Sequence, residues 1–169
     1  MNSFRHRHRF VPGLSALALL ITAAGCSSAD DGTTTAVPSP DAEVTKLCRN
    51  LDTVLPAKVD GETRGDPEPA SALTAGWGSP AIILRCGVAR PPKMADPEVA
   101  DGHDPDALPG GVNGVDWLME KQDDGAFRFT TANREAYVEV YVPRGQDTTG
   151  VLVDLAAGIK KAIPEGIAS

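Results

Sequence analysis

Two cysteines, Cys48 and Cys86, constrain the fold most strongly, because each falls on the apolar face of an expected element. Apolar residues recur at helical spacing over residues 44–55, which predicts an amphipathic helix that begins after Asp41 and buries Cys48. Residues 81–88 are typical of a strand, and Cys86 lies on its core face. Packing this helix on the sheet would bring the two thiols together, so the sequence predicts a Cys48–Cys86 disulfide.

The rest of the chain predicts more strands and a second helix. Residues 115–119, 127–130 and 137–142 alternate between apolar and polar side chains, and residues 152–163 form an amphipathic stripe. We expect an α+β domain with an antiparallel sheet of about four to five strands in a meander, and with the N-terminal and C-terminal helices packed on one face. Residues 90–113 are a long connection, which at this length is either functional or disordered.

The first 25 residues predict a secretory signal, since a basic start precedes an apolar run at residues 14–24. This run is too short for a transmembrane helix, which needs roughly 20 residues to span a bilayer. Residues 23–26 read Ala-Ala-Gly-Cys and resemble a bacterial lipobox. The resemblance implies that Cys26 receives a diacylglyceryl group and becomes the new N-terminus, anchored on the outer face of the cytoplasmic membrane. Ordinary cleavage at a small-residue site, which would release a soluble protein, is the alternative.

These signals divide the chain into three parts. Residues 1–25 are the expected signal peptide, residues 26–40 the lipidated cysteine and a flexible Ser/Thr/Pro tether, and residues 41–169 a single extracytoplasmic domain. The chain has three cysteines. Lipidation of Cys26 would leave Cys48 and Cys86 as a pair, and disulfides persist outside the cytoplasm.

The charge of the exported part argues against nucleic acid as a partner. Of 16 lysines and arginines, three lie in the first 25 residues, so 13 remain against 23 acidic residues, a net charge of −10. An acidic domain is repelled by nucleic acid and by anionic lipid headgroups. We therefore expect the lipid on Cys26, rather than the domain surface, to make the contact with the membrane.

Residues 77–88 contain the run Trp-Gly-x-Pro-Ala-Ile-x-Leu-Arg-Cys-Gly-Val. Together with blocks at residues 115–117, at Arg134 and at residues 138–143, this run resembles an actinobacterial family of small secreted lipoproteins that carry a domain of unknown function. The resemblance covers most of the chain from Cys48 onward. It implies an actinobacterial cell envelope and no particular activity.

The usual catalytic and metal-binding patterns are missing from the sequence. After the signal segment the only histidine is His103, and no C-x-x-C, phosphate-binding or dinucleotide-binding motif occurs. The serine in residues 76–80 falls one place late for a nucleophile elbow. The acidic loop at residues 101–106 is either a solvated loop or a weak Ca²⁺ ligand set. We expect no catalytic residue, no cofactor and no metal.

Arg85 is the centre of a candidate binding surface. Mid-strand and on the face turned away from the helices, it should lie beside Glu139 and Arg128, with Tyr137 and Tyr141 nearby. One interpretation is a cross-strand ion pair that orders the sheet. The other is a partly open surface of arginine and aromatic side chains, the composition enriched at interfaces.

Trp77, between two glycines, has two similar interpretations, since it either fills the core or presents a contact from an exposed turn. The leading functional hypothesis is a non-catalytic domain that binds a cell-envelope ligand, such as a cell-wall component, or a protein partner. A carboxylate-based cell-envelope hydrolase is one alternative. A structural accessory subunit of a membrane complex is the other.

Overall fold

The computed structural model describes residues 33–79 and 81–168. The expected signal peptide, Cys26 and the tether up to residue 32 lie outside the described residues. Within the described part, the chain forms these helices and strands in order: α1 (Ala42–Asp52), β1 (Lys58–Val59), β2 (Glu62–Thr63), β3 (Thr74–Trp77), β4 (Ile82–Cys86), the 3-10 helix η1 (Pro92–Ala95), α2 (Pro97–Ala100), β5 (Ala107–Val112), β6 (Val115–Lys121), β7 (Phe127–Ala132), β8 (Val138–Val142) and α3 (Thr148–Ala162).

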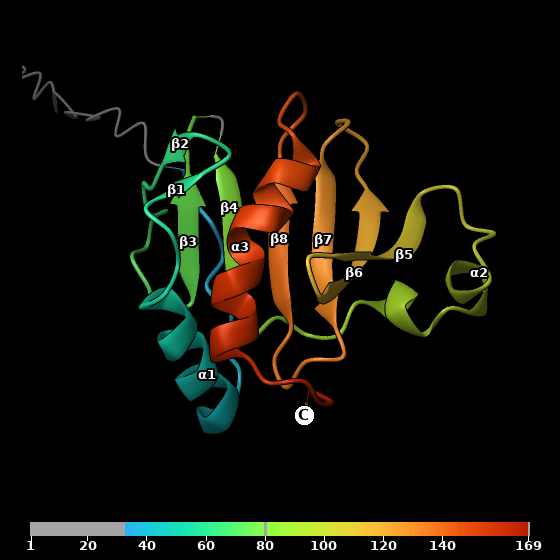
Figure 1. Ribbon diagram of the computed structural model, residues 1–169, viewed down its shortest axis with the longest axis horizontal. Coiled ribbons are helices and arrows are strands. Elements are labelled where there is room, and N and C mark those ends of the chain that lie inside the picture. The colour runs from blue at the N-terminus through green and yellow to red at the C-terminus, as the bar shows by residue number, and fades with distance from the viewer. Residues whose placement is uncertain (1–32, 80, 169) are drawn as a thin grey trace, which may run out of the picture. The chain divides into compact units, whose positions relative to one another are not determined.

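The main sheet has six strands in the order β3-β4-β8-β7-β6-β5 (Figure 1), and all neighbouring pairs are antiparallel. A separate ribbon, β1–β2, turns at Asp60 and Gly61, whose φ angles of 49° and 81° suit a tight hairpin. The prediction of an α+β fold with an antiparallel sheet is confirmed.

The expected meander of about four to five strands is wrong in strand number. Strands β5 to β8 do follow one another as neighbours, but after β4 the chain crosses to the opposite edge of the sheet and begins β5 there. The missed strand β5 reads Ala-Leu-Pro-Gly-Gly-Val, which has no apolar–polar alternation. Pro109 fits because β5 is an edge strand, bonded only to β6, where a missing N–H is tolerated.

Both long helices begin after an aspartate that caps them. The carboxylate of Asp41 accepts two backbone N–H groups of the first turn of α1 at 2.8 and 2.9 Å, as predicted. Asp147 accepts one at 3.0 Å and so starts α3 at Thr148, ahead of its apolar stripe. Helix α1 ends at Asp52, before the expected end near Leu55.

The main core lies between the long helices and one face of the sheet. Alternate residues of β4 and β8 enter it, and α3 crosses in front of these strands in Figure 1. Its principal members are Val44, Cys48 and Leu51 of α1, Ile82, Leu84 and Cys86 of β4, Val138, Val140 and Val142 of β8, and Leu152, Leu155 and Ile159 of α3.

The predicted disulfide is present. Cys48 of α1 and Cys86 of β4 are bonded, with their Cα atoms 5.5 Å apart, and each residue is only 1% exposed. The bond therefore fixes the N-terminal helix directly to an interior strand of the sheet.

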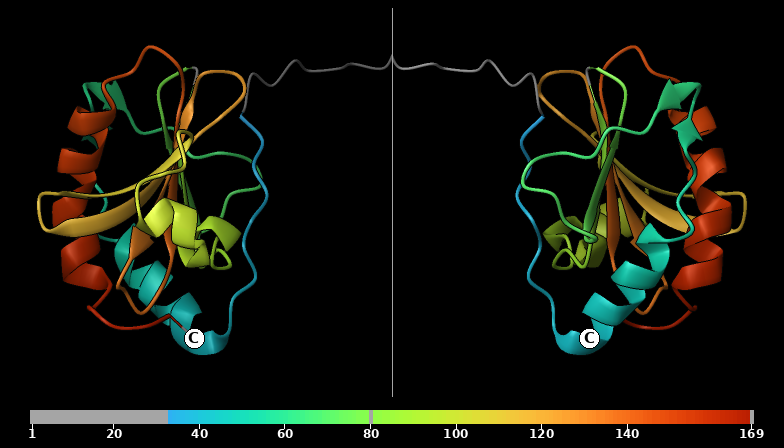
Figure 2. Two further views of the ribbon diagram at one scale, coloured as in Figure 1. Left: turned by 90° about the vertical axis from the view of Figure 1, so that its right-hand side faces the viewer. Right: turned by 90° about the vertical axis from the view of Figure 1, so that its left-hand side faces the viewer.

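The side chains on the other face of the sheet, called the far face below, include Ile83, Arg85, Leu118, Thr130 and Glu139. Figure 2 shows α3 on one side of the sheet and the segment of η1 and α2 on the other. A second, small apolar cluster forms under this segment, where Val99, Ala107 and Leu118 are buried and Met94 packs on them. Residues 90–113, expected as a connection, thus supply a cover for part of the far face and the edge strand β5.

Residues 33–40, called the strap below, lie within the expected tether. Thr35 donates its N–H to the Glu68 carbonyl at 3.0 Å, and Glu68 donates to the Thr33 carbonyl at 2.9 Å. Pro40 sits so close to Gly87 that an added Cβ there would lie 2.6 Å from Pro40 Cγ. The strap runs behind β3 and β4 in Figure 1 and on the far-face side in Figure 2, so it is packed against the domain.

Candidate functional site

The strand register places the candidate surface in the middle of the far face. Thr74, Arg85, Glu139, Thr130 and Leu118 each lie opposite the next across β3, β4, β8, β7 and β6. Because side chains opposite one another in a sheet point to the same face, these five form one transverse row. The sequence-based expectation that Arg85 and Glu139 share this face therefore agrees with the register.

Glu139 lies between two arginines. Its Oε1 accepts from Arg85 Nε at 2.9 Å and lies 2.7 Å from Arg85 Nη2, and its Oε2 is 3.6 Å from Arg128 Nε. The Glu139 side chain is 12% exposed, so the pairing is shielded from water. This is the cross-strand ion pair that was one of the two interpretations, and it links β4, β8 and β7.

Tyr141 is held at the edge of this surface by the β6–β7 hairpin. Its hydroxyl donates to Asp124 Oδ2 at 2.8 Å, and Asp124 Oδ1 accepts the Ala126 N–H at 2.9 Å. The Ala126 N–H and then the Tyr141 hydroxyl lower the pKa of Asp124. The same bond with Asp124 raises the pKa of Tyr141.

Trp77 does not belong to the candidate surface, so its inclusion there was wrong. It lies opposite Ile82 at the end of β3, shares the core face with it, and is fully buried. Its indole Nε1 donates to the Pro56 carbonyl at 3.0 Å, which satisfies the ring's polar atom. The exposed-turn interpretation failed because Trp77 is the last residue of strand β3 and the turn begins only after it, at residues 78–79.

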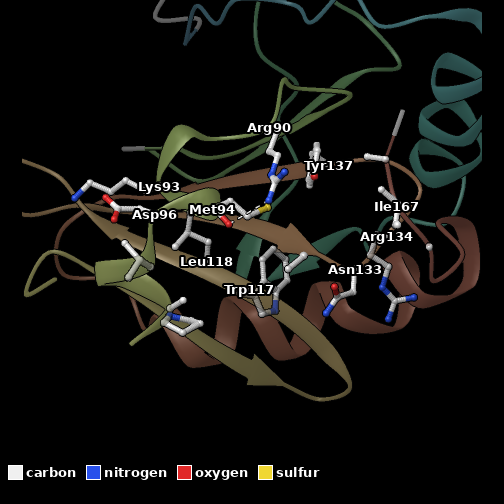
Figure 3. Close-up of a pocket in the computed structure, with 16 residues that line it drawn as sticks. Arg90, Lys93, Met94, Asp96, Trp117, Leu118, Asn133, Arg134, Tyr137 and Ile167 are labelled. Carbon is white, nitrogen blue, oxygen red and sulfur yellow. Dashed lines mark hydrogen bonds between the residues drawn. The ribbon is translucent and has the colours of Figure 1, made fainter. Parts of the chain in front are cut away.

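A cavity of about 430 Å³ opens on the far face next to this row. Its floor includes Leu118, Ala132 and Tyr137, and its cover comes from η1 and α2 with Met94 and Val99. Figure 3 labels Leu118, Tyr137 and Met94 among these residues. The chain around residues 133–134 and the C-terminal residues 166–168 also line it. Of the residues in the predicted surface, Tyr137 lines this cavity, whereas Arg85, Arg128, Glu139 and Tyr141 are not among its lining residues.

Arg134 lines the cavity but is committed to the backbone. Its Nη1 donates to the Ile163 carbonyl at 3.1 Å and its Nη2 to the Gly114 carbonyl at 3.0 Å. Ile163 is the C-cap of α3, where the helix dipole favours a cation. The exposed Glu165 carboxylate is 3.6 Å from the guanidinium. Arg134 therefore ties the β7–β8 turn to the end of α3.

Lys93 and Arg90 are the other two cations on the cavity. Lys93 Nζ donates to Asp104 Oδ2 at 2.8 Å, and this bond raises the pKa of Lys93 and is the largest cause of the lowered pKa of Asp104. In the described part of the chain, Arg90 Nη2 donates only to the Met94 carbonyl, at 3.3 Å. Within the described residues no carboxylate lies within ion-pair distance of Arg90.

Residues 33–79 and 81–168 contain no group of three or more histidine, cysteine or acidic side chains placed to hold a metal ion. In the acidic loop, Asp104 pairs with Lys93, and Asp106 lies 3.8 Å from Lys121. His103 is exposed and 3.9 Å from Glu98. Over the same described residues, no helix has the length and apolarity that crossing a membrane requires.

A family model described as "Protein of unknown function (DUF3515)" matches residues 10–168. The chain belongs to the DUF3515 family. No curated protein and no solved structure matches this DUF3515 protein. The family membership agrees with the predicted domain of unknown function and assigns no activity to the cavity.

Sequence reasoning missed the cavity of this DUF3515 protein. Its cover comes from residues 90–100, where the polar and proline-rich sequence gave no periodic signal. Two local signals were present, since Asp96 caps α2 by accepting the Glu98 N–H at 3.0 Å and Pro97 occupies the first helical position. Neither signal tells which face of a distant sheet the short helix will cover.

Proposed function

We propose that this DUF3515 protein is an exported lipoprotein, anchored through Cys26 on the outer face of the cytoplasmic membrane. Its domain would bind a small ligand or protein partner of the cell envelope without chemically changing it. The observation that carries the binding proposal is the far-face cavity of about 430 Å³, covered by η1 and α2. Ligand sites are concave, mostly apolar and furnished with a few polar groups, as this cavity is.

The cavity lining supports binding rather than chemistry. Among the described residues that line it there is no serine, cysteine, threonine or histidine, and Asp96 is the single carboxylate. That carboxylate accepts the Glu98 N–H as the cap of α2. A carboxylate-based hydrolase needs two such groups facing each other across a substrate, so the cavity favours the binding proposal over that alternative.

Ligand binding is tested by the melting temperature of the full chain with muropeptides, wall precursors and simple sugars. A ligand specific for the folded state raises the melting temperature, by mass action. The shift should be lost in Ala132→Phe, which fills the cavity floor, and kept in Val153→Phe, which adds the same ring on the exposed side of α3. A shift that survives Ala132→Phe would place the binding elsewhere. No shift with any compound would argue against a small-molecule ligand and leave the protein-partner form of the proposal.

The anchor is tested separately, by fractionating cells that make the wild-type chain or Cys26→Ala. We expect the wild-type protein in the membrane fraction, with a diacylglyceryl mass on its N-terminal cysteine, and the variant outside that fraction. A free Cys26 thiol in the membrane-bound wild-type protein would contradict lipidation.

A further inference from the structure

We infer that the far-face cavity takes a ligand with one carboxylate and an apolar body, with the carboxylate held by Arg90 and Tyr137. This inference rests on the proposed binding function and names the chemistry of its ligand. Two sources share this chemistry, a free small carboxylic acid and the C-terminal residue of a peptide.

The argument for a carboxylate begins with the cations on the cavity. Lys93 is neutralised by Asp104 at 2.8 Å, and Arg134 is held by the carbonyls of Ile163 and Gly114. Among the described residues, the Arg90 side chain makes one hydrogen bond, to the Met94 carbonyl at 3.3 Å, so most of its guanidinium donors remain available. A guanidinium with free donors matches a carboxylate in both charge and geometry.

Tyr137 supplies a second donor at the same end of the cavity. Tyr137 directly precedes β8 and lines the cavity, and within the described residues its hydroxyl makes no hydrogen bond. Gly87 donates its N–H to the Tyr137 carbonyl at 2.8 Å. Arg90 lies three residues after Gly87, so this backbone bond keeps Arg90 and Tyr137 close together. Figure 3 shows both side chains on one side of the cavity, with Trp117 and Asn133 on the other.

The remaining lining suits an apolar body. Val99 and Leu118 are both 3% exposed and belong to the small cluster apart from the main core, with Met94 packed on it. Methionine adapts its shape to a bound group, which suits a cover over a ligand. Among the described lining residues, a second negative charge on the ligand would find no further unpaired cation, and Asp96 also lines the cavity. A single carboxylate is therefore favoured over a phosphate.

Calorimetric titration of the full chain distinguishes the two sources. The free-acid probe is N-acetyl-leucine, with N-acetyl-leucine amide as its neutral match. The peptide probe is Gly-Gly-Gly-Leu, with its C-terminal amide as match. We expect at least one acid to bind about tenfold or more tightly than its amide, because only the acid forms charged hydrogen bonds. The acid that binds better identifies the source.

The variants locate the contact. Arg90→Gln should weaken the binding of the preferred acid about tenfold or more and erase its advantage over the amide, whereas Tyr137→Phe should weaken it by a smaller factor. Arg144→Gln, an exposed arginine outside the cavity, should leave the affinity unchanged.

Three results would overturn the inference alone. The first is equal binding of acid and amide, and the second is an Arg90→Gln protein that binds the acid as the wild type does. The third is that neither acid binds while another compound still raises the melting temperature and Ala132→Phe abolishes that shift; the proposed function would then still stand. If no acid binds and no compound gives a shift, the small-molecule form of the proposed function fails with the inference.

Discussion

At the scale of single residues, Glu139 determines the charge balance of the far face. It is the one carboxylate between Arg85 and Arg128, and its side chain is 12% exposed. Charged hydrogen bonds in such a place are stronger than on an open surface, because water screens them less. Loss of this carboxylate would leave the guanidinium groups of Arg85 on β4 and Arg128 on β7, one on each side of β8, with no negative charge between them.

Replacement of Glu139 by glutamine should therefore lower the free energy of unfolding by about 2 kcal/mol, the usual worth of hydrogen bonds to a charged group. Urea denaturation near neutral pH measures the change. Glu98→Gln is the matched control, because its carboxylate is 72% exposed and should contribute less than about 0.5 kcal/mol. Equal changes in the two variants would mean that the ion pair contributes nothing measurable.

The bond between Tyr141 and Asp124 should give a pH-dependent stability. The pKa of Asp124 is lowered, so its contribution is present above about pH 3.9 and is lost as the pH falls further. The pKa of Tyr141 is raised, so its contribution is present below about pH 10 and is lost as the pH rises further.

The melting temperature of Tyr141→Phe should consequently lie below that of the wild type from about pH 5 to about pH 9, and the two should converge at both extremes. Scanning calorimetry across this range measures the difference. A difference that is the same at pH 3 as at pH 7 would rule out Asp124 as the partner of the hydroxyl.

At the scale of elements, the strap is joined to the domain at two places. Its start is hydrogen-bonded to Glu68, and its end packs on Gly87, just after β4. Gly87 has φ of 85°, a conformation that other residues adopt at a cost. Packing of the strap therefore requires glycine at residue 87 for two reasons: it has no side chain to clash with Pro40, and it adopts a positive φ without strain.

Gly87→Ala should destabilise the domain and release the strap, since the added Cβ would lie 2.6 Å from Pro40 Cγ. Gly102→Ala is the control: Gly102 has φ of 73° but no atom within 4 Å of an added Cβ, so it carries only the backbone cost of about 1 kcal/mol. Hydrogen exchange at Thr35 and Glu68 should accelerate in the first variant only. Equal exchange in both would show that Pro40 moves away at no cost.

At the scale of the whole molecule, the disulfide joins the N-terminal helix to β4, an interior strand of the sheet. It closes a segment of 38 residues that includes β1, β2 and β3. A closed loop of this length restricts the unfolded chain, which in the chain-entropy account is worth about 4 kcal/mol. The bond thus supports a domain whose sheet pairs strands far apart in sequence, such as β4 with β8.

Cys48→Ala/Cys86→Ala should therefore lower the free energy of unfolding by about 4 kcal/mol. Guanidinium denaturation measures this free energy. The reduced wild-type chain should be as stable as the double variant to within about 1 kcal/mol, because replacing each cysteine by alanine leaves only a small cavity. If the oxidised chain and the double variant were equally stable, the disulfide would be dispensable for the fold.

Features that depend on near neighbours in the chain could be predicted from the sequence. The Asp41 cap, the alternation in residues 138–142 and the apolar faces that carry Cys48 and Cys86 are local patterns, and the α+β class and the disulfide follow from them. Features that depend on residues far apart in the sequence became visible only in the folded structure. The edge strand β5 exists because β6 offers it hydrogen bonds, despite Pro109 and two glycines.

Trp77 is buried because β3 pairs with β4, and the cavity exists because the chain crosses the far face between β4 and β5. A sequence pattern records which side chains suit a buried surface, whereas the partner that buries them is set by the packing of the whole chain.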